Sequence, residues 1–137
     1  FTLAGDVAWR DYGVAVDVHF NSEASATVMG RIDSADVFQD GKEPWPSGYI
    51  LRLEPDGNWM LLCTKYKQPA RTLASGSIRI DRNQWHRLEL RFHGKQIIAS
   101  LDGPRLAATE DSTHSHGMFA LGTEWNYIQF DNLQVTP

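Results

Sequence analysis

The chain has 137 residues, of which 42% are hydrophobic and 22% are charged. This composition is typical of one globular domain with its own core, and it excludes a disordered or fibrous chain. The formal net charge of −4 gives no general attraction to phosphate backbones or anionic lipids, so neither nucleic acid nor a membrane surface is an expected partner. No apolar run approaches the roughly 20 residues of a membrane span.

Strand signals run through the whole chain. Apolar and polar side chains alternate with a period of two in Tyr12–Phe20 and again in Leu88–Phe92. No segment keeps an apolar stripe at helical spacing, so we expect little or no helix. Shorter candidate strands are Ala26–Ile32, Gly48–Glu54, Asn58–Lys65, Ser77–Ile80, Lys95–Leu101, Gly117–Leu121 and Asn126–Val135.

Turn residues separate several of these strands. Pro55–Asn58, His93–Lys95 and Asp102–Pro104 each suit a hairpin or another tight connection. Residues 33–47 and 107–116 lack strand signals and are expected to be loops. About nine or ten short strands in a chain of this length predict an all-β fold, an antiparallel β-sandwich.

The last candidate strand changes its apolar phase. Ile128 and Phe130 are apolar at even positions, whereas Leu133 and Val135 are apolar at odd positions. Such a change of phase by one residue predicts a β-bulge at Asp131-Asn132, which would redirect the Asp131 carboxylate.

The acidic residues do not form the pattern that catalysis needs. A retaining glycosidase uses two carboxylates about 5–5.5 Å apart, and alternate positions of one strand would supply them most simply. Glu54 and Asp56 straddle a turn, Glu89 stands between arginines, and Glu110-Asp111 lies in a predicted loop. The sequence also lacks the Gly-x-Ser-x-Gly motif of an activated serine. We therefore expect a noncatalytic chain, with a small glycosidase as one alternative.

Calcium is the metal that the residue types favour. Asp6, Asp33 and Asp131 stand near strand ends or the predicted bulge, where backbone carbonyls are also available to a hard cation. If the first and last strands pair, Asp6 and Asp131 could meet. The alternative is that these carboxylates accept backbone hydrogen bonds at turns.

The other metal and thiol candidates are weaker. His114 and His116 could form a metal pair, but two histidines in a polar segment are more often only part of a loop. Cys63 lies in an apolar strand and is expected to be a buried, unreactive thiol.

The five tryptophans are the candidates for sugar stacking. Trp9 and Trp85 adjoin clear strands and are expected in the core, while Trp59 is ambiguous. Trp45 lies between two prolines in a predicted loop, and Trp125 precedes the last strand. A rigid exposed aromatic ring would suit carbohydrate, although packing of Trp45 against its own loop is the alternative.

Several stretches form a pattern in chain order: Phe1–Asp6, Trp9–Tyr12, Val16–Val18, Met29–Ile32, Pro55–Trp59, Gln84–Leu88, Gly122–Thr123 and Gln129–Val135. Taken together they resemble the C-terminal lectin domain of galactosylceramidases. The resemblance implies one lectin-like domain over residues 1–137, with a jelly-roll fold of the concanavalin A-like and laminin-G-like type. It also implies that the domain is a piece of a larger glycoside hydrolase, whose catalytic carboxylates lie on a separate barrel.

The resemblance further implies a structural calcium ion. Its ligand region corresponds to Asp6, Asp33, Ser34 and Asp131 of this chain. At Asp33 the family tends to have Asn, but either side chain offers an oxygen ligand.

The leading hypothesis is a carbohydrate-binding module of a secreted, extracellular or lysosome-like glycoside hydrolase, directed to galactose or another glycan. Trp45, Trp125 and Tyr127 would stack on the sugar, and Arg52 would supply polar contacts. The alternative is a structural domain that packs on the catalytic barrel and shapes its substrate entrance without binding sugar. That alternative predicts a large exposed apolar patch.

Overall fold

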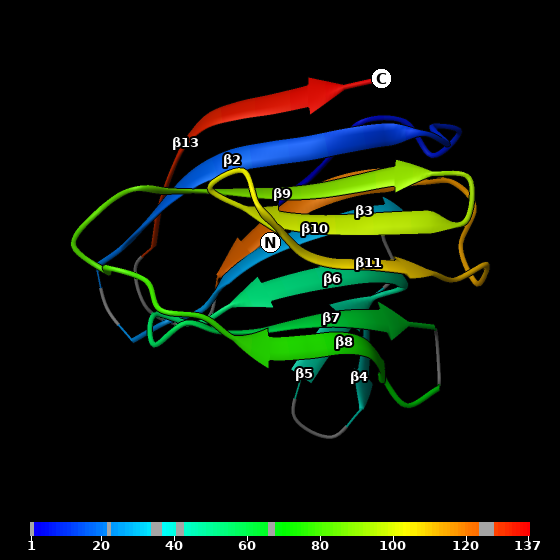
Figure 1. The fold of residues 1–137 in the computed structure, drawn as a ribbon. Coiled ribbons are helices and arrows are strands. Elements are labelled where there is room, and N and C mark those ends of the chain that lie inside the picture. The colour runs from blue at the N-terminus through cyan, green and yellow to red at the C-terminus, as the bar shows by residue number, and fades with distance from the viewer. Residues whose placement is uncertain (1, 22, 34–36, 41–42, 66–67, 124–127) are drawn as a thin grey trace.

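The computed structural model describes residues 2–21, 23–33, 37–40, 43–65, 68–123 and 128–137. Within these ranges the chain forms thirteen strands and no helix, arranged as two antiparallel sheets and one two-stranded hairpin (Figure 1). The predicted antiparallel β-sandwich is therefore confirmed. None of the described residues belongs to a helix with the length and hydrophobicity of a membrane span.

The first sheet has six strands, and every neighbouring pair is antiparallel. In sheet order these strands are β1 (Thr2–Ala4), β12 (Met118–Thr123), β3 (Ala26–Ile32), β6 (Gly48–Leu53), β7 (Asn58–Thr64) and β8 (Arg71–Ser77).

The second sheet has five strands and packs on one face of the first (Figure 1). In sheet order these strands are β11 (Arg105–Glu110), β10 (Gln96–Leu101), β9 (His86–His93), β2 (Tyr12–Phe20) and β13 (Ile128–Thr136).

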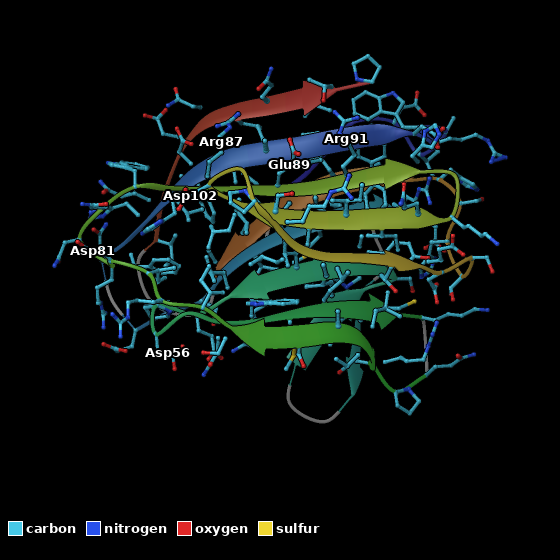
Figure 2. All side chains as sticks on the ribbon, in the orientation of Figure 1. Asp56, Asp81, Arg87, Glu89, Arg91 and Asp102 are labelled. Carbon is cyan, nitrogen blue, oxygen red and sulfur yellow. The ribbon has the colours of Figure 1, made fainter. Side chains whose placement is uncertain are left out.

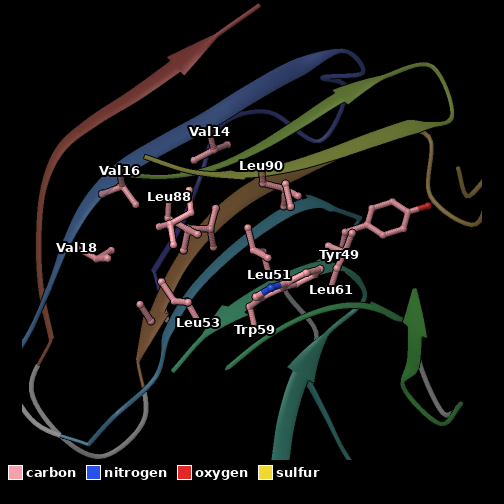
Figure 3. Packing of buried hydrophobic residues seen from close by; sticks show 14 of the residues in the cluster. Val14, Val16, Val18, Tyr49, Leu51, Leu53, Trp59, Leu61, Leu88 and Leu90 are labelled. Carbon is pink, nitrogen blue, oxygen red and sulfur yellow. The ribbon is translucent and has the colours of Figure 1, made fainter. Parts of the chain in front are cut away.

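The main core lies between the two sheets, because alternate residues of each strand point inward. Figure 3 shows side chains of β2 and β9 directed toward side chains of β6 and β7. The labelled members of this core are Val14, Val16, Val18, Leu88, Leu90, Tyr49, Leu51, Leu53, Trp59 and Leu61.

A second, smaller apolar cluster lies on the other face of the six-stranded sheet, called here the outer face. Ile50 alternates with inward-facing Tyr49 and Leu51, and it is fully buried together with Ile32. The hairpin of β4 (Val37–Asp40) and β5 (Glu43–Pro46) extends from this side of the sheet (Figures 1 and 3). The outer face of β6 is therefore apolar and buried at Ile50. Further along the same strand, at Arg52, it is polar.

Three predicted boundaries were wrong. The segment 33–47 contains β4 and β5, and the segment 107–116 begins inside β11. The strand predicted at 77–80 lies earlier, as β8, and is more exposed than a core strand. In each case pairing with a neighbouring strand supplies backbone hydrogen bonds that the local side-chain pattern does not indicate.

The predicted bulge in the last strand is confirmed. The pairing of β13 with β2 shifts register between Asp131 and Gln134, and Asn132 has a φ of 51°. The Asp131 Oδ1 atom accepts a hydrogen bond from the Asn132 backbone nitrogen at 2.8 Å. The Asn132 side chain donates to Asp17 Oδ2 at 2.7 Å, which ties the bulge to β2.

Candidate functional site

A groove of about 580 Å³ opens on the outer face, over the strands β6, β7 and β8. This volume lies within the roughly 300–1,000 Å³ typical of small-ligand sites. Arg52, Met60 and Ser75 form one cross-strand row of paired positions on adjacent strands. The remaining lining residues are Glu54, Asn58, Trp59, Gly76 and Ser77.

A tight turn brings Glu54 and Asn58 to one end of the groove. The backbone of Gly57 donates to the Glu54 carbonyl at 2.9 Å, and Gly57 has a φ of 94°, which glycine tolerates best. The Asp56 carboxylate accepts hydrogen bonds from the backbone and side chain of Asn58, both at 3.0 Å. The hairpin predicted at Pro55–Asn58 is confirmed, and it fixes the polar end of the groove.

The groove combines both signs of charge with one exposed apolar side chain. Arg52 Nε donates to Ser25 Oγ at 3.0 Å, and Arg52 Nη2 lies 3.7 Å from Glu54 Oε1. These side chains are held, yet Arg52 is 21% exposed and Glu54 is 39% exposed. Met60, at 38% exposure, adds an apolar surface between the polar groups. The arrangement can donate and accept hydrogen bonds around one ligand.

A second polar cluster, at the opposite end of β6, is closed to solvent. The Arg31 side chain is 1% exposed, and its guanidinium lies 4.8 Å from the centre of the Phe92 ring. Arg31 Nε and Nη2 donate to the Arg10 carbonyl at 3.0 and 2.8 Å, and Nη1 donates to the His114 carbonyl at 3.3 Å. Arg31 therefore fastens two chain segments onto the sandwich.

Tyr49 and Asp111 extend this closed cluster. The Tyr49 hydroxyl donates to Asp111 Oδ1 at 2.7 Å, and Arg71 Nη2 contacts Asp111 Oδ2 at 2.7 Å. Burial by itself would raise the pKa of Asp111, but hydrogen bonds from Tyr49, Thr113 and Arg71 outweigh it and hold that pKa well below its usual range. The bonds from Tyr49 and Arg71 join Asp111 to distant strands, so the cluster has a structural role.

A buried histidine joins two turns at the end of the sandwich that carries Asp56, Asp81 and Asp102 (Figure 2). His86 Nδ1 lies 2.7 Å from Asp102 Oδ2, and His86 Nε2 lies 2.6 Å from the Asp81 carbonyl oxygen. Both partners are acceptors, so the doubly protonated ring satisfies both contacts. Burial alone would lower the pKa of His86, but the contacts with Asp102 and Asp81 raise it overall.

The outer face of the five-stranded sheet is polar and largely cross-linked. Arg87, Glu89 and Arg91 lie along β9 in Figure 2. Arg87 Nη1 contacts Asp17 Oδ1 at 2.9 Å, and Arg87 Nη2 donates to Gln134 Oε1 at 3.1 Å. These contacts brace β9 against β2 and β13.

Of the residues predicted to bind carbohydrate, Arg52 is the one that the structure places in the groove. Trp45 lies in β5, paired in register with Phe38, and its side chain is not among those described. Trp125 and Tyr127 lie outside the described residues. The stacking roles proposed for these three aromatic residues stay predictions.

The predicted calcium ligands lie on separate elements. Asp6 Oδ1 accepts a hydrogen bond from the Ala8 backbone, Asp33 lies 3.8 Å from His114 Nδ1, and Asp131 caps the bulge in β13. Ser34 is outside the described residues. Across the ranges that the structure describes, no three His, Cys, Asp or Glu side chains are grouped to hold a metal ion. The calcium site with these four ligands stays a prediction.

Two tryptophans predicted for the core are partly exposed. Trp9 is 38% exposed, although its ring stacks on Phe119 with centres 6.3 Å apart. Trp85 is 48% exposed, because it lies in the connection before β9 and not in the strand itself. Trp59 does lie in the core, and Cys63 is buried as predicted.

Part of the groove is marked by a pattern in the sequence. Arg52 and Glu54 are polar at alternate positions of an otherwise apolar strand, which indicates one solvent-facing stripe. Asn58 and Met60 continue that stripe on β7, but sequence reasoning did not connect the two strands. Ser75 and Ser77 were missed because β8 was predicted at the wrong place.

The two packed antiparallel sheets form a β-sandwich, the fold that solved structures of a carbohydrate-binding module and of galectins share with this chain. The family described as "Galactocerebrosidase, C-terminal lectin domain" matches residues 1–137. The chain belongs to this family. It is accordingly a lectin-type module and not a catalytic domain.

Solved structures share the fold at low sequence identity. Carbohydrate-binding module CBM66 from Bacillus subtilis has a TM-score of 0.73 and 20% identity, covering 93% of this chain and 76% of that one. Sheep galectin-11, in complex with glycerol, has a TM-score of 0.68 and 10% identity, covering 98% and 96%. Domains LG4-5 of the mouse laminin α1 chain have a TM-score of 0.53 and 17% identity, covering 85% and 30%. No curated protein sequence matches the chain.

Proposed function

We propose that this chain binds an uncharged glycan in the groove over β6, β7 and β8, as an accessory module of a glycoside hydrolase. The observation that carries the proposal is the convergence of Arg52, Glu54, Asn58 and Ser75 around an open groove with an apolar floor at Met60. Sugars present hydroxyl groups that both donate and accept, together with apolar C–H faces. A few fixed polar groups on a partly apolar surface match that chemistry.

The charges favour an uncharged sugar over an acidic one. Arg52 is the cation of the groove lining and already lies beside Glu54. A second carboxylate, Asp56, binds Asn58 at the end of the groove. A uronic or sialic acid would bring a further negative charge to a groove whose guanidinium already lies beside Glu54 and whose end adjoins Asp56, and repulsion would weaken its binding.

Galactose as the preferred sugar, a catalytic domain as the partner, and a secreted or lysosome-like location belong to the same proposal. The family to which the chain belongs supports the sugar and the partner, since its description couples a galactocerebrosidase with a lectin domain. Thermal unfolding in calcium and in EDTA tests the predicted calcium ion. A higher Tm in calcium than in EDTA, with the difference abolished by Asp131→Asn, would support that ion.

Isothermal titration of the 137-residue chain with galactosides, β-glucans and xylans tests the glycan proposal. We expect Arg52→Ala to weaken binding of the preferred glycan at least about tenfold, because a charge-assisted hydrogen bond to a ligand contributes about 1.5–3 kcal/mol. Arg105→Ala is the matched control, since Arg105 is exposed on the edge strand β11 of the other sheet. Equal affinity of both variants would contradict the groove as the binding site.

The alternative function, a structural domain that shapes the entrance of a catalytic barrel, predicts one large apolar patch. The large apolar side chains exposed among the described residues are instead spread over the segment before β2, the strands β7 and β13, and the connection before β9. This distribution favours the glycan-binding proposal.

A further inference from the structure

Trp85 is a large aromatic side chain that neither the core nor the groove uses. It is 48% exposed, in the connection from Ser77 at the end of β8 to His86 at the start of β9. Its ring lies against His19 of β2, with the ring centres 5.4 Å apart and the planes inclined by 45°. Part of the indole is thus supported by the protein, and about half of the residue faces solvent.

The support of this indole is rigid. His19 Nδ1 lies 2.8 Å from Asn21 Oδ1, and His19 Nε2 lies 3.3 Å from the Asn83 carbonyl oxygen. The connection is itself held at Asp81, whose carboxylate accepts from the Asn83 backbone at 2.9 Å and whose carbonyl accepts from the Gln84 backbone at 3.1 Å. A ligand that stacked on Trp85 would therefore find the ring already in position, and little ordering cost would oppose binding.

Asn21 and Asn83 lie at the two nitrogen edges of the His19 ring against which Trp85 packs. Asn21 and Asn83 are both exposed. The Asn21 side chain and the Asn83 backbone each contact a nitrogen of the His19 ring, and the Trp85 ring packs against the same histidine. Within the described part of the chain, the Asn83 side chain makes no hydrogen bond, and Asn21 uses only its Oδ1 atom. These amides can donate to and accept from hydroxyl groups at the rim of a ring stacked on the indole.

We propose that Trp85, Asn21 and Asn83 form a second carbohydrate site, which takes one sugar ring of an uncharged glycan. The indole contacts the apolar C–H face of the sugar, and the two amides hydrogen-bond its hydroxyl groups. The site is separate from the groove over β6–β8, although it rests on the same premise that the chain binds glycans. It gives a role to a half-exposed tryptophan that neither the core nor the groove uses.

Nuclear magnetic resonance of the ¹⁵N-labelled chain tests this site, because each of the five tryptophans gives its own indole N–H signal. The Trp85 signal is assigned by its absence in Trp85→Phe. Galactobiose, cellotetraose and xylotetraose are then added to millimolar concentration. We expect at least one sugar to shift the Trp85 signal in the natural chain and equally in Arg52→Ala, which keeps the second site.

Trp85→Ala supplies the affinity measurement. The titration is followed through the backbone amide signals of Asn21 and Asn83, and we expect its apparent Kd to rise at least about tenfold, the scale of losing one aromatic stacking contact. An unchanged thermal unfolding curve shows that the variant is folded, and Trp85→Phe, which keeps an aromatic face, should lie between the two.

Two results would overturn the second site. One is a Trp85 signal that none of the sugars moves at millimolar concentration. The other is a Trp85→Ala variant that binds as tightly as the natural chain. Shifts confined to residues of the groove, abolished by Arg52→Ala, would reject the second site while supporting the groove.

Discussion

Arg31 and Arg52 lie on neighbouring strands of one sheet and make opposite use of the same side chain. The guanidinium of Arg31 is 1% exposed and donates to backbone carbonyls from two distant segments. The Arg52 side chain is 21% exposed, and its guanidinium lies beside Ser25 and Glu54 at the edge of an open groove. The first arginine is engaged by the fold, whereas the second faces a space that a ligand can enter.

This contrast separates structural polar groups from binding groups within one molecule. A buried polar cluster that is satisfied from all sides stabilises a single conformation and leaves nothing for a ligand to complete. A partly exposed cluster with fixed geometry can exchange water for ligand atoms. Arginine content alone therefore does not indicate a binding site, and the partners of each side chain decide its role.

Replacing the two arginines gives the sharpest test of the comparison. We expect Arg31→Leu to lower the free energy of unfolding by about 3–5 kcal/mol, because the Arg10 and His114 carbonyls lose their donor and the Asp11 carboxylate loses its cation. Arg52→Ala should stay within about 1 kcal/mol of the natural chain, as is usual for a partly exposed side chain. Urea unfolding measures both. Similar losses for the two variants would contradict the division between closed cluster and open groove.

A methyl group beside Arg31 should have the next largest effect. A Cβ atom at Gly30 would overlap the Phe92 ring, on which the Arg31 guanidinium packs. We expect Gly30→Ala to cost about 1–3 kcal/mol through overpacking of the core. Gly13→Ala is the matched control, since its Cβ would meet only the end of the long Arg91 side chain, which can move aside. Thermal unfolding of the two variants makes the comparison, and equal Tm values would refute it.

The smallest effect is a pH dependence at the buried His86. Its pKa is raised above the ordinary 6.5 in the folded chain, so protonated His86 stabilises the fold fully below about pH 6.5. That contribution is lost as the pH rises through the raised pKa. We expect the unfolding free energy of the natural chain to fall over this interval, and that of His86→Gln to change less. Parallel pH profiles of the two proteins would contradict the role of His86.

Local patterns were sufficient for much of the sandwich. Alternation in Tyr12–Phe20 and Leu88–Phe92 gave the two central strands of the five-stranded sheet, because one face of each is buried. The hairpin at Pro55–Asn58 follows from the backbone preferences of its own residues. The bulge in β13 could be predicted from a single change of phase.

Features that depend on distant partners could not be predicted in this way. The β4–β5 hairpin is a local exception, since its two strands pair with each other but no alternation of apolar and polar residues marks them. The exposure of Trp85 depends on where the 78–85 connection meets β2, and the groove depends on the register of β8 beside β7. Tertiary contacts of this kind override local propensity.

The bulge at Asp131-Asn132 also bears on solubility. The strand β13 is an edge of its sheet, and its residues 131–134 are exposed. A regular edge strand offers its unpaired backbone groups to strands of other molecules, which leads to aggregation. The left-handed Asn132 interrupts that regular edge, and the adjacent Asp131 adds a charge to it. The same irregularity that redirects one carboxylate therefore also disfavours pairing of β13 with a strand of another copy.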